Sequence, residues 1–200
     1  RLRRALSQEI CQQYDFILID TPPGLGYIAT NVLIASDEVI IPSQAEMFSI
    51  FGVQKVTDWI REIKEYSNSA LKIAGVLITR YKAGTIVNDE CRTALEAFAK
   101  QHGIGQLVIK DGANGAKLYS ENKWHEKEAF KITPIDTVGA GDGFDAGYIY
   151  AALHNYSPIE SLTFANAVGA LVTTVKGDNE GLPELQEVLD FMNNKKAIER

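Results

Sequence analysis

Four short, uninterrupted apolar runs constrain the fold of this 200-residue chain more than any other feature of its sequence. They predict buried strands at residues 16–19, 39–41, 71–79 and 106–110. Unbroken β-branched runs, without the alternation of a half-exposed strand, are typical of a parallel sheet that is covered on both faces. We therefore expect an α/β protein of three layers (α/β/α), with a mostly parallel, doubly wound sheet.

Segments with helical spacing separate these strands. They predict helices at residues 2–12, 28–35, 49–66 and 85–101. In the third of these helices, five apolar residues recur on one stripe that would face the sheet: Ile50, Val53, Val56, Ile60 and Ile63. Because strand and helix alternate, we expect βαβ units with right-handed crossovers.

The pattern changes after Lys110. Turn-forming residues flank two short runs, 116–120 and 124–127, whose close spacing predicts an antiparallel hairpin at the sheet edge. Helices are predicted beyond them, at residues 141–153, 159–175 and 185–193, with Ser157-Pro158 as the cap and first turn of the second. No linker-like stretch separates the halves, so we expect residues 1–200 to form a single composite domain.

The composition excludes several classes of function. The net charge is −6, with 9 Lys/Arg against 11 Asp/Glu in residues 1–90 and 11 against 15 in residues 91–200, so nucleic-acid binding is disfavoured. Cys11 and Cys91 lie far apart, which argues against a disulfide framework and fits a cytoplasmic protein. No apolar run has the ~20 residues of a membrane helix, so we expect no membrane association. The absence of an initiator Met indicates a piece of something longer.

Residues 14–26, YDFILIDTPPGLG, place an apolar strand before an aspartate and a Pro/Gly turn. This segment, with residues 35–42 and 75–81, resembles the Walker-B region and following strands of ParA-type partition ATPases over roughly residues 1–90. The resemblance implies that Asp20 helps to organise magnesium and the attacking water. The sequence contains no Gly-Lys-Ser/Thr, the phosphate-binding motif of that family. We therefore also consider Asp20 as a strand-end turn former.

Residues 136–148, DTVGAGDGFDAGY, form the strongest motif in the chain. A Gly-rich entry to a helix offers free amides and a positive dipole end to an anion. The motif resembles the second signature of ribokinase-like (PfkB-type) sugar kinases, whose C-terminal part residues 91–200 resemble. The resemblance implies an anion hole at Gly139, Ala140 and Gly141, and a catalytic base at Asp142.

The neighbouring segments 108–116 and 164–170 also resemble this family. They imply that Lys110, Gly112 and Gly115 lie near the phosphates of a nucleotide and that Asn166 and Gly169 lie near its adenine. ATP is the implied nucleotide. Magnesium stays open, because no Asn in the chain has Glu three residues later, as the family's magnesium motif requires.

Plainer interpretations of the same residues stay open. Gly139–Gly141 could form a tight helix entry only, and Lys110 could be a solvated charge at a strand end. The spacing of Gly141, Gly143 and Ala146 imitates a dinucleotide fingerprint, although no second strand ends in an acid at the required distance. The three histidines show no metal-ligand spacing, so no metal site is predicted.

Three hypotheses of function follow. The first is a recombined or engineered scaffold, joined near Asn88–Arg92, that binds phosphate or nucleotide without a complete active site. The second is an ATP-dependent sugar kinase that uses Asp142 as its base. The third is a ParA-type ATPase that uses Asp20. The oligomeric state stays open, including a dimer formed through an unpaired strand edge.

Overall fold

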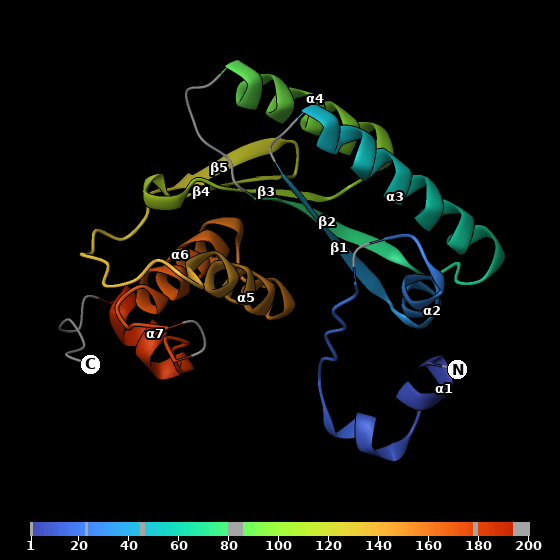
Figure 1. Ribbon diagram of the computed structural model, residues 1–200, viewed down its shortest axis with the longest axis horizontal. Coiled ribbons are helices and arrows are strands. Elements are labelled where there is room, and N and C mark those ends of the chain that lie inside the picture. The colour runs from blue at the N-terminus through green and yellow to red at the C-terminus, as the bar shows by residue number, and fades with distance from the viewer. Residues whose placement is uncertain (1, 23, 45–46, 80–85, 178–179, 194–200) are drawn as a thin grey trace.

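The computed structural model describes residues 2–22, 24–44, 47–79, 86–177 and 180–193, and it contains a five-stranded mixed sheet in the order β1-β2-β3-β4-β5 (Figure 1). The strands are β1 Glu38–Gln44, β2 Lys72–Thr79, β3 Gln106–Lys110, β4 Ala116–Ser120 and β5 Lys123–Lys127. The first three pair in parallel, and β3, β4 and β5 pair antiparallel. The predicted α/β class, parallel strands and antiparallel hairpin edge are confirmed.

Two helical layers cover the sheet (Figure 1). The helices α3 (Met47–Tyr66) and α4 (Ile86–His102) lie over one face. On the opposite face lie α5 (Ala140–Leu153) and α6 (Pro158–Val172), and α7 (Leu185–Met192) packs against α6. The helix α2 spans Tyr27–Ala35. Apart from the N-terminal helix, the predicted helices exist to within a few residues of their expected bounds. Arg80, Tyr81 and Thr85 lie outside the described residues.

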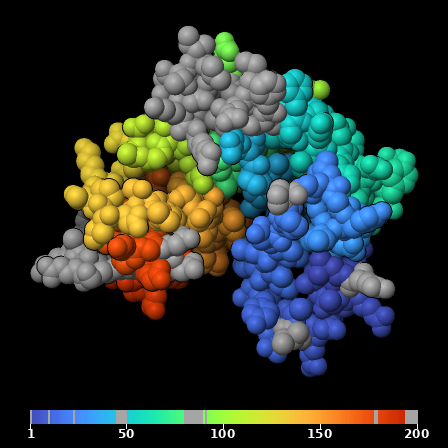
Figure 2. Space-filling model, in the orientation of Figure 1, coloured from blue at the N-terminus to red at the C-terminus, as the bar shows by residue number. Residues whose placement is uncertain are grey.

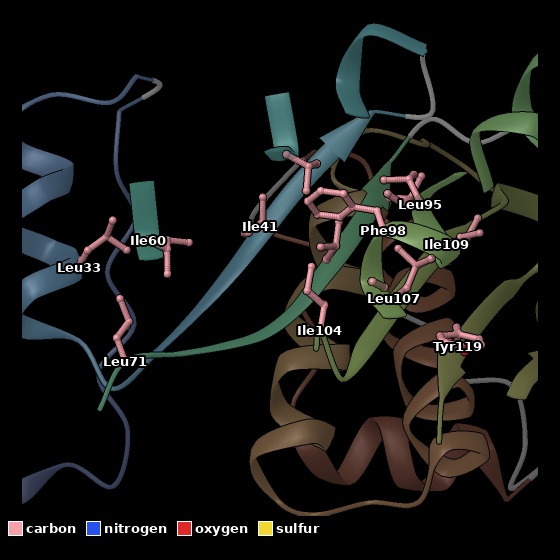
Figure 3. Close-up of a cluster of buried hydrophobic side chains, with 14 of the residues drawn as sticks. Leu33, Ile41, Ile60, Leu71, Leu95, Phe98, Ile104, Leu107, Ile109 and Tyr119 are labelled. Atoms are coloured by element: carbon pink, nitrogen blue, oxygen red, sulfur yellow. The ribbon is translucent and has the colours of Figure 1, made fainter. Parts of the chain in front are cut away.

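Successive residues of the central strands enter two different hydrophobic clusters, as the twofold period of a strand requires. Val76 and Ile78 of β2 face α3 and α4, whereas Leu77 between them faces α5 and α6. Figure 3 shows side chains of the first cluster, among them Ile60 of α3, Phe98 of α4 and Ile41 of β1. This burial on both faces explains the uninterrupted apolar runs in the sequence. The predicted stripe on α3 is confirmed at Val53, Val56, Ile60 and Ile63, and the side chain of Ile50 is not described.

The predicted strand at residues 16–19 is wrong. The segment has no assigned secondary structure and pairs with no described strand, and β1, beyond which no strand is described, forms the sheet edge. Phe16, Ile17 and Leu18 are exposed, and the ring of Phe16 contacts only the ring of His154, 5.8 Å away, among aromatic partners in the described chain. An apolar run becomes a buried strand only where a neighbouring strand and a covering layer meet it, and no described element supplies both.

The N-terminal helix is also shorter than predicted. It divides into α1 (Leu2–Leu6) and a 3₁₀ turn (Glu9–Gln13). Figure 2 shows these blue residues as a lobe that projects from the body of the molecule. Side chains of α1 contribute no fully buried residue, so little tertiary packing supports a longer helix there.

The start of α6 provides a first test of the local structure. The Ser157 side chain accepts a hydrogen bond from the Glu160 amide, and the Glu160 carboxylate accepts one from the Ser157 amide, which makes a full capping box. We expect Ser157→Ala to lower the free energy of unfolding by about 1 kcal/mol. Chemical denaturation measures this, and Ser157→Asp, which keeps a capping acceptor, should retain most of the stability.

Candidate functional site at the N-terminus of α5

The first turn of α5 begins at Gly139, which adopts a left-handed conformation (φ 76°) that favours glycine. No described side chain caps this helix. The amides of Gly141 and Asp142 therefore have no side-chain acceptor, in contrast to the capped start of α6. Together with the helix dipole, uncapped amides favour a negatively charged group at this position.

Lys110, the last residue of β3, reaches this helix end. Its ammonium Nζ lies 2.8 Å from each carboxylate oxygen of Asp145 and 3.1 Å from the carbonyl oxygen of Gly141. The ammonium also lies 5.9 Å from the centre of the Phe144 ring. The Lys110 side chain is only 15% exposed, so it is not the solvated charge that one interpretation of the sequence allowed.

Two acidic residues share the first turns of α5. Asp142 is exposed, and Asp145, one turn later, is partly buried beside Lys110. Burial raises the pKa of Asp145 above its ordinary value against the opposing pull of the Lys110 ammonium, and the charge of Asp142 raises it further. One cation and two carboxylates thus surround the amides of the helix end.

The loop that enters α5 is fixed by Asp136. Its carboxylate accepts hydrogen bonds from the amides of Val138 and Gly177, and these bonds, with that of Val138 first, hold the pKa of Asp136 below its ordinary value. The amides of Ile135 and Asp136 in turn donate to the carbonyl of Thr173, beyond α6. The position of Gly139 is therefore set by contacts to the C-terminal end of α6.

Gly169 brings α6 close to the same turn. A Cβ at this position would lie 3.1 Å from the carbonyl oxygen of Ala140 and 3.4 Å from Cβ of Phe144. Gly169 thus allows the two helices to approach closely at the start of α5. The structure brings Lys110, Gly139–Gly141, Asp142 and Gly169 together around one helix end.

Gly115 and Asn166 lie instead beside the segment that leaves β5. A Cβ on Gly115 would lie 2.1 Å from the carbonyl oxygen of Lys127. The buried Asn166 side chain donates hydrogen bonds to the carbonyls of Lys127 and Glu128, each at 3.2 Å. Both residues hold backbone in place. Gly112, in the 3₁₀ turn Gly112–Asn114, has open space around it.

Asp20 stands apart from these residues. It is exposed, and its carboxylate accepts a hydrogen bond from the amide of Thr21, its neighbour in sequence. The nearby Phe16 contacts His154, which follows the C-terminal end of α5. The local bond fits the turn-forming interpretation of Asp20.

Asp145, Asp136 and Phe144 had no predicted role. Asp145 could have been found from its spacing, because residues i and i+4 share a helix face and Gly141 is such a neighbour. The reach of Lys110 to that face depends on the arrangement of β3 against α5, which no local pattern encodes. No group of three or more potential metal ligands occurs among the residues that the structure describes. None of the described helices is long and apolar enough to cross a membrane.

The fold is similar to that of ribokinase-type α/β proteins. The structure of a putative ribokinase II from E. coli in complex with ATP and Mg²⁺ aligns with a TM-score of 0.57 at 20% identity, over 82% of this chain and 61% of that one. Ribokinase of Arabidopsis thaliana, complexed with ribose and ATP, aligns with a TM-score of 0.57 at 18% identity, over 86% and 60%. Residues 76–185, more than half of the chain, match the model of the pfkB family of carbohydrate kinases. The chain therefore belongs to the pfkB family.

The first part of the chain is similar to a different group. Residues 1–73 match a model described as an AAA domain. The sporulation initiation inhibitor protein Soj of Bacillus subtilis is 42% identical over 85 residues, which are 42% of this chain and 33% of that protein. The chromosome partitioning protein ParA of Myxococcus xanthus is 41% identical over 111 residues, 56% of this chain and 39% of that protein. The chain spans only 33% and 39% of the length of these two relatives. A ParA-like segment precedes a pfkB-like one, as the motifs predicted.

The two matched ranges meet between residues 73 and 76, within β2. The predicted junction at 88–92 lies inside α4 and not at a strand–helix connection. An alignment of 111 residues is too long to fit within residues 1–90, so the ParA-like similarity overlaps the pfkB-like range.

Proposed function

We propose that residues 1–200 form one composite α/β domain that binds the phosphate groups of a nucleotide, with ATP as the nucleotide, at the N-terminus of α5. The observation that carries this proposal is the first turn of α5, with its left-handed Gly139 and with no described side chain that caps it. Its place in the range that matches carbohydrate kinases supports phosphate as the anion. The sheet that contains strands of both segments supports one domain.

We further propose that the chain transfers no phosphate to a sugar and is a recombined scaffold. A ParA-like segment occupies residues 1–73, so this chain presents ParA-like residues before its kinase-like part. A base without a positioned acceptor hydroxyl loses the contribution of proximity, worth ~7–11 kcal/mol in favourable cases. The exposed, unpaired segment that precedes Asp20 gives the ParA-type ATPase hypothesis no support.

ATP binding is tested by calorimetry and thermal unfolding of the whole chain. We expect ATP to raise the unfolding temperature, by the equivalent of about 2.7 kcal/mol at a hundredfold excess over its dissociation constant. Gly141→Val should weaken ATP binding, because a Cβ at this position would lie 3.5 Å from the Lys110 ammonium, where we place the phosphate group. Ala146→Val, on an exposed position of the same helix, is the matched control. Equal affinities of both variants and the parent would contradict the assignment of the site.

A second candidate function is sugar phosphorylation with Asp142 as the base. The exposure of this side chain in the first turn of α5 favours it, because an acceptor hydroxyl could reach the carboxylate. A coupled assay that detects ADP in the presence of a panel of sugars separates the two candidates. We expect no sugar-dependent ADP, whereas turnover that Asp142→Asn abolishes would replace our proposal with the kinase.

A further inference from the structure

Lys110 is a cation at the proposed phosphate site, and its ammonium already has partners within the chain. The ammonium donates to Asp145 and to the carbonyl of Gly141, and it lies 2.8 Å from both Asp145 oxygens. An ammonium has three N–H donors. An incoming phosphate must therefore compete with a carboxylate of the same chain for this lysine.

We propose that Asp145 acts as an internal counter-ion that occupies Lys110 and sets a low affinity of the α5 site for phosphate groups. This inference rests on the proposed function and concerns the affinity of that same site. The Asp145 carboxylate lies within hydrogen-bond distance of Lys110, where a phosphate oxygen would have to lie to contact the same ammonium. Asp145 is thus a residue that limits how tightly the site binds an anion.

The balance of charge supports this role. Lys110 contributes one positive charge, and Asp142 and Asp145 contribute two negative charges, so the side chains around the amides carry a net charge of −1. The ion pair is only 15% and 25% exposed at its two side chains, so solvent screens it weakly. A highly charged triphosphate meets repulsion that the amides and the helix dipole must overcome.

A purely structural ion pair is the alternative. Lys110 connects the end of β3 to α5, and such a contact would stabilise the fold whatever the site binds. One oxygen of Asp145 is buried without a well-aligned donor, although the ammonium is close to it. The carboxylate therefore loses hydration that the lysine only partly replaces, so the pair is a poor choice for stability alone.

The test compares ATP with adenosine, the same ligand without phosphates, by calorimetry on the whole chain. We expect Asp145→Asn to strengthen ATP binding on the order of tenfold, because it removes one negative charge and releases Lys110. Adenosine affinity should stay constant. The double variant Lys110→Gln/Asp145→Asn should lose the gain that depends on the lysine. Asp145→Ser serves if the Asn variant does not fold.

Glu126→Gln is the matched control, because it releases Lys117 from a similar 2.9 Å ion pair on β4 and β5. It should change neither affinity. If the parent binds ATP and Asp145→Asn binds it equally well, or gains as much for adenosine, the counter-ion inference is overturned while the proposed function stands. If neither protein binds ATP, both fail. Binding that is detectable only after Asp145→Asn supports both.

Discussion

Gly115→Ala is expected to destabilise the protein by at least about 3 kcal/mol and to leave little folded chain at 37 °C. Gly115 has φ 105° and ψ −138°, a region that is nearly closed to residues with a side chain. A methyl group would also overlap the carbonyl oxygen of Lys127, 2.1 Å away, and the amide of Ala129, 2.7 Å away. Backbone on both sides must move, because no flexible side chain is available to give way. Circular dichroism with urea denaturation measures the loss.

Gly112→Ala is the control for this prediction. Gly112 also has a positive φ, of 55°, but no atom lies within 4 Å of the position of its Cβ. The cost there is limited to left-handed backbone strain, about 1–2 kcal/mol. Equal losses in the two variants would show that conformation alone, and not contact with the segment after β5, accounts for Gly115.

Asn166→Asp is expected to cost about 3–5 kcal/mol at neutral pH. Asn166 is buried, and its amide nitrogen donates to the carbonyls of Lys127 and Glu128. The introduced carboxylate would turn two hydrogen bonds into repulsion between oxygens, without hydration to compensate. Burial would raise the pKa of that carboxyl above its value in the unfolded chain.

The sign of the pH dependence follows from that raised pKa. Below the pKa of the carboxyl in the unfolded chain, about 3.9, the carboxyl is neutral and the variant has its highest free energy of unfolding. This free energy falls as the pH rises through the pKa of the carboxyl in the folded chain. Urea denaturation at acid and neutral pH measures this difference. Asn193→Asp is the control, because Asn193 also donates to a carbonyl, that of Leu189, but is exposed. A pH-independent loss at Asn166 would contradict the explanation.

The sequence predicted those elements whose burial depends on their own pattern. The runs at β2 and β3 are buried on both faces, so their residues had to be uniformly apolar, and α3 shows its stripe because one side faces the sheet. The run at Phe16–Ile19 has the same apolar character but no partner strand among the residues that the structure describes. Local composition reports that a segment can be buried, whereas pairing depends on elements elsewhere in the chain.

The candidate site shows the same division. The Gly-rich entry to α5 could be predicted, because a left-handed glycine and an uncapped first turn are local properties of Gly139–Gly141. The partners of Lys110 could not, since Asp145 lies 35 residues away and on another layer. Gly115 and Asn166 stay predicted nucleotide contacts, and in the structure both also lie against the backbone at and after the end of β5. A motif identifies residue types, but it does not show which of these residues support the backbone.

The position of the ParA-like and pfkB-like boundary within β2 has a consequence for cooperativity. The cluster beneath α3 and α4 draws side chains from Leu33 to Tyr119, and it therefore crosses the boundary between the two similarities. Unfolding of either segment would remove a neighbouring strand from β2 or β3 and expose the hydrophobic core of the other segment to water. We therefore expect the ParA-like and pfkB-like segments to unfold together, without a stable half-unfolded species of the described sheet.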